Sequence, residues 1–310
     1  MGAGVLAPVE IKKSELYFLW DGMCYVMRES IVLCFLYKTV FGRMVLKFLV
    51  QPGVSHITGK FLSSSLSRWL VPYYIWKHKI DMDDIEIPPK GFSSFNDFFI
   101  RNRRIECCDL TRGHLISPCD GLLTHIRIKK DFVFEIKNTR FYLEDLLEDH
   151  KLAKAFQNGA ALIFRLSAAD YHRYCYMANG RIRYFKKIQG KLHCVRPIAL
   201  RTVPVFVQNS REYQVIETDQ FGTMIQMEIG ALLVGKIKNY RQPLDQGDVR
   251  AGEEKGYFEF GGSTILVLLK ENAIYFNEKL YERQNSDGEI PVDMGECVAK
   301  TKKGRRLCNE

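Results

Sequence analysis

The feature that most constrains this chain is a pair of glycines placed directly before an apolar run. Residues 265–269 read Ile-Leu-Val-Leu-Leu, which is typical of a buried strand. The preceding Gly261-Gly262-Ser263-Thr264 puts a hydroxyl on backbone that can bend tightly. One interpretation is a turn or bulge before the strand. The other is a reactive serine, because Gly262 has no side chain to block attack of the Ser263 hydroxyl on the preceding carbonyl. That reaction requires a base from elsewhere in the chain.

Short strands separated by turn residues follow one another through most of the sequence. The hydrophobic pattern predicts strands at residues 121–128, 132–136, 160–165, 181–188, 202–207, 213–218, 222–228, 232–237 and 263–269. A helix is predicted at 143–157, where Asn158-Gly159 ends it, and Ser94 is expected to cap a short helix. The predicted fold class is therefore α+β, with a β-sandwich or barrel-like catalytic core and N-terminal amphipathic helices.

The N-terminal quarter is predicted to be helical and basic. Residues 14–50 are rich in large apolar side chains, partly at helical spacing, and Pro52-Gly53 ends this stretch. A second helical segment at 62–70 is expected to end before Pro72. Eight basic residues and one acidic residue lie between Arg28 and Lys79, which accounts for +7 of the net charge of +9. Such helices either pack on the core or dock on an anionic membrane, where each base contributes about 1 kcal/mol.

Aromatic residues mixed with the bases favour the membrane. Trp69, Tyr73 and Trp76 accompany Lys77 and Lys79, as in segments that lie at a bilayer interface. A nucleic-acid surface would present its bases as a polar patch, whereas here bulky aliphatic residues separate them. The expected partner is an anionic phospholipid membrane and not nucleic acid. The acidic stretch 81–90 predicts a boundary between a membrane-docking region, 1–88, and a catalytic domain, 89–310.

Cysteine usage and hydropathy predict the compartment. Nine cysteines without a Cys-x-x-Cys pair suit neither a zinc knuckle nor a disulfide framework, so reduced thiols and no metal site are expected. The N-terminus lacks the basic start and apolar core of a secretory signal. The uncharged runs fall far below the roughly 20 apolar residues of a spanning helix. We therefore expect a peripheral, membrane-associated protein on the cytoplasmic side.

Two polar motifs offer partners for the serine. Ser117-Pro118-Cys119-Asp120-Gly121 puts a carboxylate at a turn before a strand, and Asp170-Tyr171-His172-Arg173 follows an apolar strand. Taken alone, Asp120 is interpreted as a turn residue, and a single histidine such as His172 is usually structural. An imidazole is also the commonest general base. Asp120, His172 and Ser263 thus form a possible acid, base and nucleophile. Phosphate-loop and dinucleotide-binding motifs do not occur in the sequence.

Five segments in one order resemble the phosphatidylserine decarboxylase family. They span residues 92–269, and together they are far more specific than any one of them. The segments are Phe95-Asn96-Asp97-Phe98-Phe99-Ile100-Arg101, Ser117-Pro118-Cys119-Asp120-Gly121, Asp170-Tyr171-His172-Arg173, Ile229-Gly230-Ala231 with Val234-Gly235, and Gly261-Gly262-Ser263-Thr264. The last is similar to the branch of the family that carries this tetrapeptide.

The resemblance implies an enzyme that makes its own cofactor. Ser263 would attack the carbonyl of Gly262, and elimination would divide the chain into a β chain, 1–262, and an α chain, 263–310. Ser263 would become a covalent pyruvoyl group, which would form a Schiff base with phosphatidylserine and release CO2 and phosphatidylethanolamine. Asp120 and His172 match the acidic and first histidine positions of the family. A homodimer of processed chains is also implied.

One position departs from the family pattern. The family commonly has a second histidine three residues after the first, where this chain has Cys175. Either His172 takes both roles, or another base substitutes, for which His193 is our hypothesis. A Cys175 thiolate suits the role less well, because an unassisted thiol has a pKa of about 8.5. Two alternatives differ in class: a non-catalytic lipid- or protein-binding relative, and a serine hydrolase that uses Asp120, His172 and Ser263 without self-cleavage.

Overall fold

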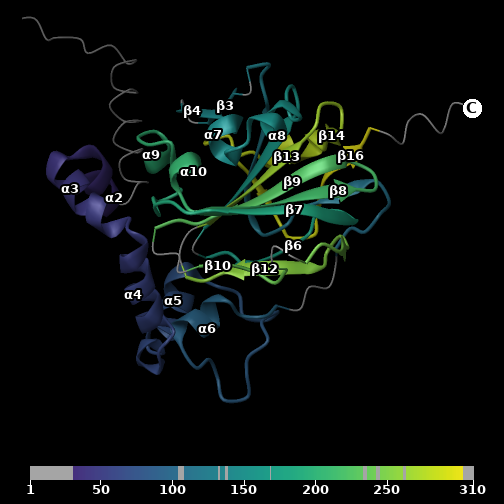
Figure 1. Ribbon diagram of the computed structural model, residues 1–310. Helices are drawn as coiled ribbons and strands as arrows, with labels where there is room; N and C mark the ends of the chain where they lie inside the picture. Colours follow the sequence, from purple (N-terminus) through teal and green to yellow (C-terminus); the bar gives the residue numbers. More distant parts are fainter. Residues whose placement is uncertain are drawn as a thin grey trace, which may run out of the picture. The chain divides into compact units, whose positions relative to one another are not determined.

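The computed structural model describes residues 31–103, 108–131, 133–136, 139–167, 169–232, 236–241, 245–260 and 263–302 (Figure 1). The backbone forms two compact units, residues 1–47 and 48–310. Predictions that concern residues 14–30, Val234-Gly235 and Gly261-Gly262 lie outside the described residues. No described helix has the length and apolar character needed to span a bilayer.

The described part of the first unit is helical. Helix α2 (Ile31–Lys38) leads through Thr39 into α3 (Val40–Leu49), which continues past the end of the unit. The Thr39 hydroxyl accepts a hydrogen bond from the Gly42 backbone N–H at 2.9 Å, so Thr39 caps the second helix. Large apolar side chains are exposed on both helices, namely Ile31, Val32, Phe35, Val40, Phe41 and Met44.

Short helices begin the second unit. They are α4 (Pro52–Leu62), the 3-10 turn η1 (Ser65–Ser67), α5 (Leu70–His78) and α6 (Phe95–Phe99). The prediction for Ser94 is confirmed, because its hydroxyl accepts from the Asp97 N–H at 3.1 Å. The expected stop before Pro72 is wrong: Pro72 lies in the first turn of α5, where the backbone N–H groups have no helical partner to lose.

An antiparallel sheet of eight strands forms the centre of the second unit. Its central strand is β13, and all seven of its side chains are buried. The order across the sheet is β11 (Asp248–Val249), β7 (Gly180–Ile188), β8 (Arg211–Thr218), β9 (Gly222–Ile229), β13 (Ser263–Leu269), β5 (Ala160–Leu166), β2 (Gly121–Arg127) and β15 (Ile290–Val292). The apolar run at 265–269 is thus confirmed as a strand buried on both faces.

A second sheet covers one face of the first. It has the order β10 (Ile237–Asn239), β12 (Glu254–Phe258), β6 (Arg173–Cys175), and Figure 1 shows it below β7 and β8. Lys255 of β12 and Glu228 of β9 form an ion pair between the layers at 2.5 Å, and both side chains are fully buried. Additional hydrogen bonds offset part of the cost of burying such a pair, and Asn239 bonds to both Lys255 Nζ and Glu228 Oε2.

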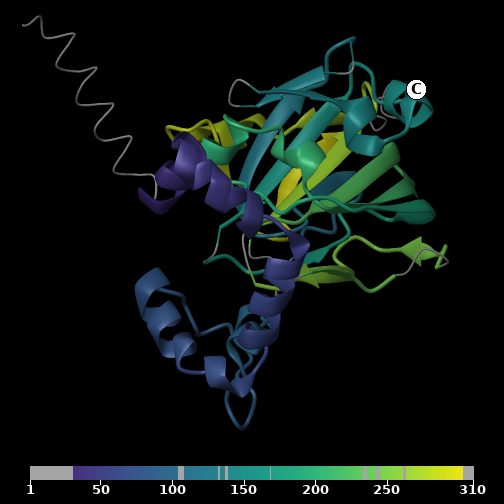
Figure 2. The ribbon, with the colours of Figure 1, turned by 60° about the vertical axis from the view of Figure 1, so that its left-hand side comes forward.

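Helices and a hairpin cover the opposite face (Figure 1 and Figure 2). They are the hairpin β3 (Val133–Ile136) with β4 (Thr139–Tyr142), and the helices α7 (Leu143–Leu147), α8 (His150–Lys154), α9 (Pro197–Leu200) and α10 (Val205–Gln208). The buried Arg211 guanidinium of β8 donates to the backbone carbonyls of Leu146 and Asp145, which fixes α7 on the sheet. A third sheet has the order β1 (His114–Ile116), β16 (Cys297–Thr301), β14 (Ile274–Phe276), and the 3-10 turn η2 (Glu278–Arg283) follows β14.

The predicted α+β class is confirmed, with two packed sheets and not a closed barrel: β11 and β15 are the edges of the described sheet. Two local predictions are wrong. The expected strand at 202–207 contains α10, because Pro204 cannot donate to a ladder and instead begins a helical turn. The expected helix at 143–157 is divided at Glu148, whose φ of 48° is left-handed, and Asp149 then caps α8.

Candidate active site

The motifs singled out in the sequence meet at one end of the eight-stranded sheet. Asp120 directly precedes β2, Leu166 ends β5, Ser263 begins β13 and Ile229 ends β9. Because neighbouring strands run antiparallel, the start of one strand lies beside the end of the next. Segments separated by more than 100 residues in the sequence therefore share one edge of the core.

Two connections in the chain lead between this edge and the second sheet. One joins β5 to β6 and carries His172, and the other joins β12 to β13 and carries Phe260. At one end Ser263 pairs with Leu166 in the β13–β5 ladder. At the other end the Phe258 N–H donates to the His172 carbonyl at 2.9 Å. The structure thus brings the segments that carry the predicted nucleophile and the predicted base to the same end of the sheet.

Ser263 is placed with its hydroxyl inside the protein. Its side chain is 0% exposed, and its Oγ has no hydrogen-bond partner among the described residues. Burying a hydroxyl without a partner costs about 1–3 kcal/mol. The Thr264 hydroxyl shares this lack of a partner, so what distinguishes Ser263 is its place directly after the Gly261-Gly262 pair of the sequence motif. Gly262, which carries the carbonyl that Ser263 would attack, lies outside the described residues.

His172 is oriented so that one ring nitrogen is set as a proton donor. Its Nδ1 lies 2.8 Å from the backbone carbonyl of Asp170. A carbonyl only accepts, so Nδ1 carries the hydrogen and the neutral ring keeps its lone pair on Nε2. The ring lies against Phe99, with centroids 3.9 Å apart, and is fully buried. Backbone and aromatic contacts together hold the imidazole in the tautomer that a general base needs.

Helix α6 links both loops, which gives the Phe95–Arg101 motif a physical role. Phe99 packs against His172 from one loop and against Phe260 from the other, at 3.9 Å and 5.0 Å between ring centroids. Asn96 accepts a hydrogen bond from the Phe260 N–H at 3.2 Å. Asn96 and Phe99 are therefore positioning residues that the sequence interpretation missed. Their signal was present, since both belong to a motif to which no role had been given.

Asp120 lies at the same edge, but its contacts go elsewhere. Its carboxylate receives two hydrogen bonds from the Arg103 guanidinium, at 2.5 Å and 3.1 Å, and one from the Met294 N–H at 2.8 Å. The carboxylate of the Asp120 motif is therefore in an ion pair with Arg103 at the edge of the core. The carboxyl inside the loop is Asp170, which accepts from the Ser167 N–H and whose pKa is raised by burial.

Cys175, which occupies the position of the family's second histidine, is buried two residues into β6. Its thiol lies 3.8 Å from the Ser117 carbonyl and packs with Ile116, Tyr171 and Met294. Burial raises the pKa of this thiol, so a neutral thiol predominates at physiological pH. A protonated thiol is a poor base, which argues against Cys175 as the substitute for that histidine.

His193 is tied to the same edge of the sheet. Its N–H donates to the Asn209 side chain, and the Asn209 amide donates to the carbonyls of His193 and Gly230. Gly230 follows Ile229, the register partner of Thr264. Burial, followed by the charge of Lys191, lowers the pKa of His193 to about 4. The imidazole is consequently uncharged at neutral pH and could accept a proton, as the hypothesis for His193 requires.

A cavity of about 250 Å³ opens beside the loop that carries His172, and it is lined by Arg101, Arg103, Asp120, Asp170 and Tyr171 among others. Arg101 is 5% exposed, and its Nε and Nη1 atoms have no partner among the described residues. Its Nη2 makes one long bond of 3.4 Å to the Ala169 carbonyl. Burial lowers the pKa of this guanidinium, but arginine keeps its charge in proteins. Arg101 thus brings a buried positive charge to a cavity that is also lined by Asp81 and Asp84.

The site therefore belongs to an α+β protein in which a buried serine begins the central strand and a buried histidine lies on the segment that follows β5. Residues 95–300 match the model of the phosphatidylserine decarboxylase family. A phosphatidylserine decarboxylase proenzyme 2 of Clostridium acetobutylicum is 41% identical over 86% of this chain and 91% of its own. Proenzymes of the same name from Ruminiclostridium cellulolyticum and Fusobacterium nucleatum are 36% and 34% identical, over 85% and 87% of this chain and 89% and 91% of theirs.

The chain belongs to the phosphatidylserine decarboxylase family, and the family expected from the five motifs is thereby confirmed. It is accordingly a decarboxylase, and the relatives' names describe proenzymes, which are precursors that mature by cleavage.

Proposed function

We propose that this protein converts phosphatidylserine to phosphatidylethanolamine and CO2 after cutting its own chain between Gly262 and Ser263. The observation that carries the proposal is the buried hydroxyl of Ser263, without a partner among the described residues, at the start of β13, where Ser263 pairs with Leu166 on the strand that leads to His172. In the first step Ser263 Oγ adds to the Gly262 carbonyl and its proton passes to a base, for which His172 Nε2 is our candidate. The peptide nitrogen then leaves, and an ester replaces the amide.

The second step cuts the chain. Loss of the Ser263 α-proton expels the Gly262 carboxylate and leaves a dehydroalanine at residue 263. Water then replaces the nitrogen, ammonia leaves, and residue 263 keeps a pyruvoyl carbonyl. The site fits this group because the Ser263 side chain is enclosed and the His172 imidazole, the candidate base, is held by Phe99 of α6. Once formed, such a carbonyl supplies an electron sink for decarboxylation. The chain's own residues exclude water, orient the substrate and move protons.

The strand order supports a stable two-chain product. Strand β13 would open the α chain, yet it lies between β9 and β5, which both belong to the β chain. Two further pairings, β15 with β2 and β16 with β1, also join the chains. Cleavage would therefore leave the α chain inside the fold, to be released only by a denaturant. The homodimer implied by the family is a further part of the proposal, and analytical ultracentrifugation would test it.

Arg101 is our candidate for holding the substrate's headgroup. Phosphatidylserine carries a phosphate and a carboxylate, and both match the unused donors of a buried guanidinium. Arg101→Gln should lower kcat/KM about 10- to 100-fold, since a hydrogen bond to a charged group contributes about 1.5–3 kcal/mol. The loss should appear mainly in KM, and self-cleavage should proceed as in the wild type.

Steady-state kinetics with short-chain phosphatidylserine in detergent would measure this effect. Arg183→Gln is the matched control, because Arg183 pairs with Glu217 at an exposed position on the sheet. An unchanged KM in Arg101→Gln would contradict headgroup binding by this residue.

Exposed apolar side chains on α4, η1 and α5 support docking on an anionic bilayer. Trp69 is 66% and Trp76 75% exposed, and Ile57, Phe61, Leu66 and Tyr73 are exposed as well. The bases Lys60, Arg68 and Lys77 lie among them. Because indole rings insert at the interface while the bases attract anionic headgroups, both terms should contribute to binding.

We expect the double variant Trp69→Ser/Trp76→Ser to bind vesicles of mixed phosphatidylserine and phosphatidylcholine at least about 10-fold more weakly than wild type. Sedimentation with vesicles would measure binding, and high salt should weaken it further by screening the bases. Tyr142→Ser, a similarly exposed aromatic residue on β4, should bind as wild type does. Equal binding by the double variant would argue against docking through these helices.

A further inference from the structure

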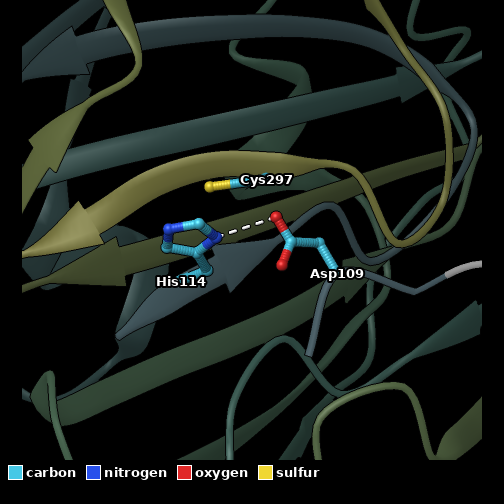
Figure 3. A group of neighbouring side chains, drawn as sticks. All are labelled: Asp109, His114 and Cys297. Atoms are coloured by element: carbon cyan, nitrogen blue, oxygen red, sulfur yellow. Dashed lines mark hydrogen bonds and ion pairs between the residues drawn. The ribbon is translucent and has the colours of Figure 1, made fainter. Parts of the chain in front are cut away.

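Three metal-binding side chains meet at the third sheet, away from the candidate active site. Asp109 precedes β1, His114 begins β1 and Cys297 begins β16. Their ligand atoms all lie within 4.8 Å of one another, and all three residues are half-buried. Figure 3 shows the three side chains pointing toward one another, with His114 Nδ1 at 2.8 Å from Asp109 Oδ2.

The local backbone brings these side chains together. The Thr111 N–H donates to Asp109 Oδ1 at 3.1 Å and the His114 N–H donates to the Thr111 carbonyl at 3.0 Å, so the turn folds Asp109 back onto His114. A bulge in the β1–β16 ladder then shifts the register, so that Ile116 faces Cys297 and not Val298. Side chains alternate along a strand, and the extra residue therefore places Cys297 on the same face as His114.

We propose that Asp109, His114 and Cys297 bind a zinc ion. Thiolate, imidazole and carboxylate are the ligands that zinc takes in proteins, and thiolate disfavours magnesium and calcium. In a tetrahedral site with ligand distances of about 2.0–2.3 Å, neighbouring donor atoms lie about 3.4 Å apart. The distance between His114 Nδ1 and Asp109 Oδ2 has to increase slightly, and the Cys297 thiol has to move closer to both atoms. Rotation of these half-buried side chains allows both changes.

A cavity beside the cluster gives the ion an entry path and a fourth ligand. The cavity has a volume of about 380 Å³ and is lined by Asp109 and His114 together with Asn179, Asp219 and Phe221. Water from it could complete a site with three protein ligands. The backbone around Cys297 is fixed independently of the metal, because the Asn277 side chain donates to the Cys297 carbonyl at 3.2 Å.

The ligands come from both sides of the proposed cut, and this consequence rests on the proposed function. Asp109 and His114 belong to the β chain and Cys297 to the α chain. Zinc would therefore join the two chains after cleavage, at a sheet where only β1 and β16 connect them. At a free zinc concentration of about 100 times Kd, the folded-to-unfolded ratio should rise about 100-fold.

Cobalt(II) titration tests the site directly, because cobalt replaces zinc and reports thiolate ligands by charge-transfer absorption. The purified full chain, stripped with a chelator and kept reduced, should take up one equivalent of cobalt with a thiolate charge-transfer band that zinc removes. Cys297→Ser should lose the band, and His114→Gln should bind at least about 100-fold more weakly, the upper range for loss of an outer-shell partner. Cys34→Ser and His125→Gln are matched controls that should bind as wild type does.

Titrations of the wild type and of Ser263→Ala separate this proposal from the proposed function. The band should appear in both, because the site exists before the cut; an uncut wild type would overturn self-cleavage and leave the metal result standing. A missing band, or an unchanged band in Cys297→Ser, would overturn the zinc site. If Cys297→Ser does not fold, the cobalt affinity of His114→Gln, which changes a half-buried side chain, tests the zinc site instead. If the cut protein is equally resistant to denaturant with and without zinc, the link between the chains is overturned.

Discussion

Ser263→Ala should remain a single chain of 36.0 kDa without decarboxylase activity, whereas the wild type should run as two fragments on a denaturing gel. The variant lacks the only atom that can add to the Gly262 carbonyl under the proposed mechanism, so both the ester and the later carbonyl group are lost. An uncatalysed peptide bond does not break on a laboratory timescale, and the effect should therefore be all or none. Intact mass spectrometry should place the wild-type cut between residues 262 and 263.

The neighbouring Thr264→Val is the control for this experiment. Thr264 is equally buried and its hydroxyl also has no partner among the described residues, but it points to the opposite face of β13. It should cut at the same bond. Under native conditions the wild-type fragments should co-elute, because β13 stays paired with β9 and β5. A cut in Ser263→Ala would refute the proposed nucleophile, and an uncut wild type would favour the serine hydrolase or the non-catalytic relative.

His172→Gln should slow self-cleavage by about 10²–10⁴, the usual contribution of a general base. Glutamine keeps a polar side chain of similar length but cannot accept and return a proton. The rate should be followed from the uncut precursor after synthesis in a cell-free extract, by the appearance of the smaller fragment. Added imidazole should restore part of the rate, which a purely structural defect would not allow.

His125→Gln is the matched control, since His125 is a histidine that stacks on Phe276 of β14, and burial lowers its pKa. It should cleave at the wild-type rate. The same assay on His193→Ala decides which base replaces the family's second histidine: a normal cutting rate together with normal decarboxylation would remove His193 and leave both roles to His172. Cleavage of His172→Gln at the wild-type rate would contradict its assignment as base.

Much of the fold was predictable because its signals are local. The apolar run of β13, the turn residues between strands and the Ser94 cap each depend on a few neighbouring residues. Predictions were wrong where the conformation of a single residue overrode the hydrophobic pattern around it. Glu148 adopts a left-handed conformation that divides one predicted helix, and Pro204 turns one predicted strand into a helix. Both effects are set by single residues whose conformation the surrounding pattern does not reveal.

The sequence by itself determined the family, the candidate serine and the candidate histidine, because these lie in short ordered motifs. Only the tertiary structure decided their surroundings. Sheet register pairs Ser263 with Leu166, and packing places Phe99 against His172. The Asp120 carboxylate accepts hydrogen bonds from the Arg103 guanidinium. Register and packing depend on contacts between residues far apart in the chain, and a one-residue bulge changes which side chains meet. For the same reason the sequence predicted no metal site, whereas the fold brings Asp109, His114 and Cys297 together across the bulge between β1 and β16.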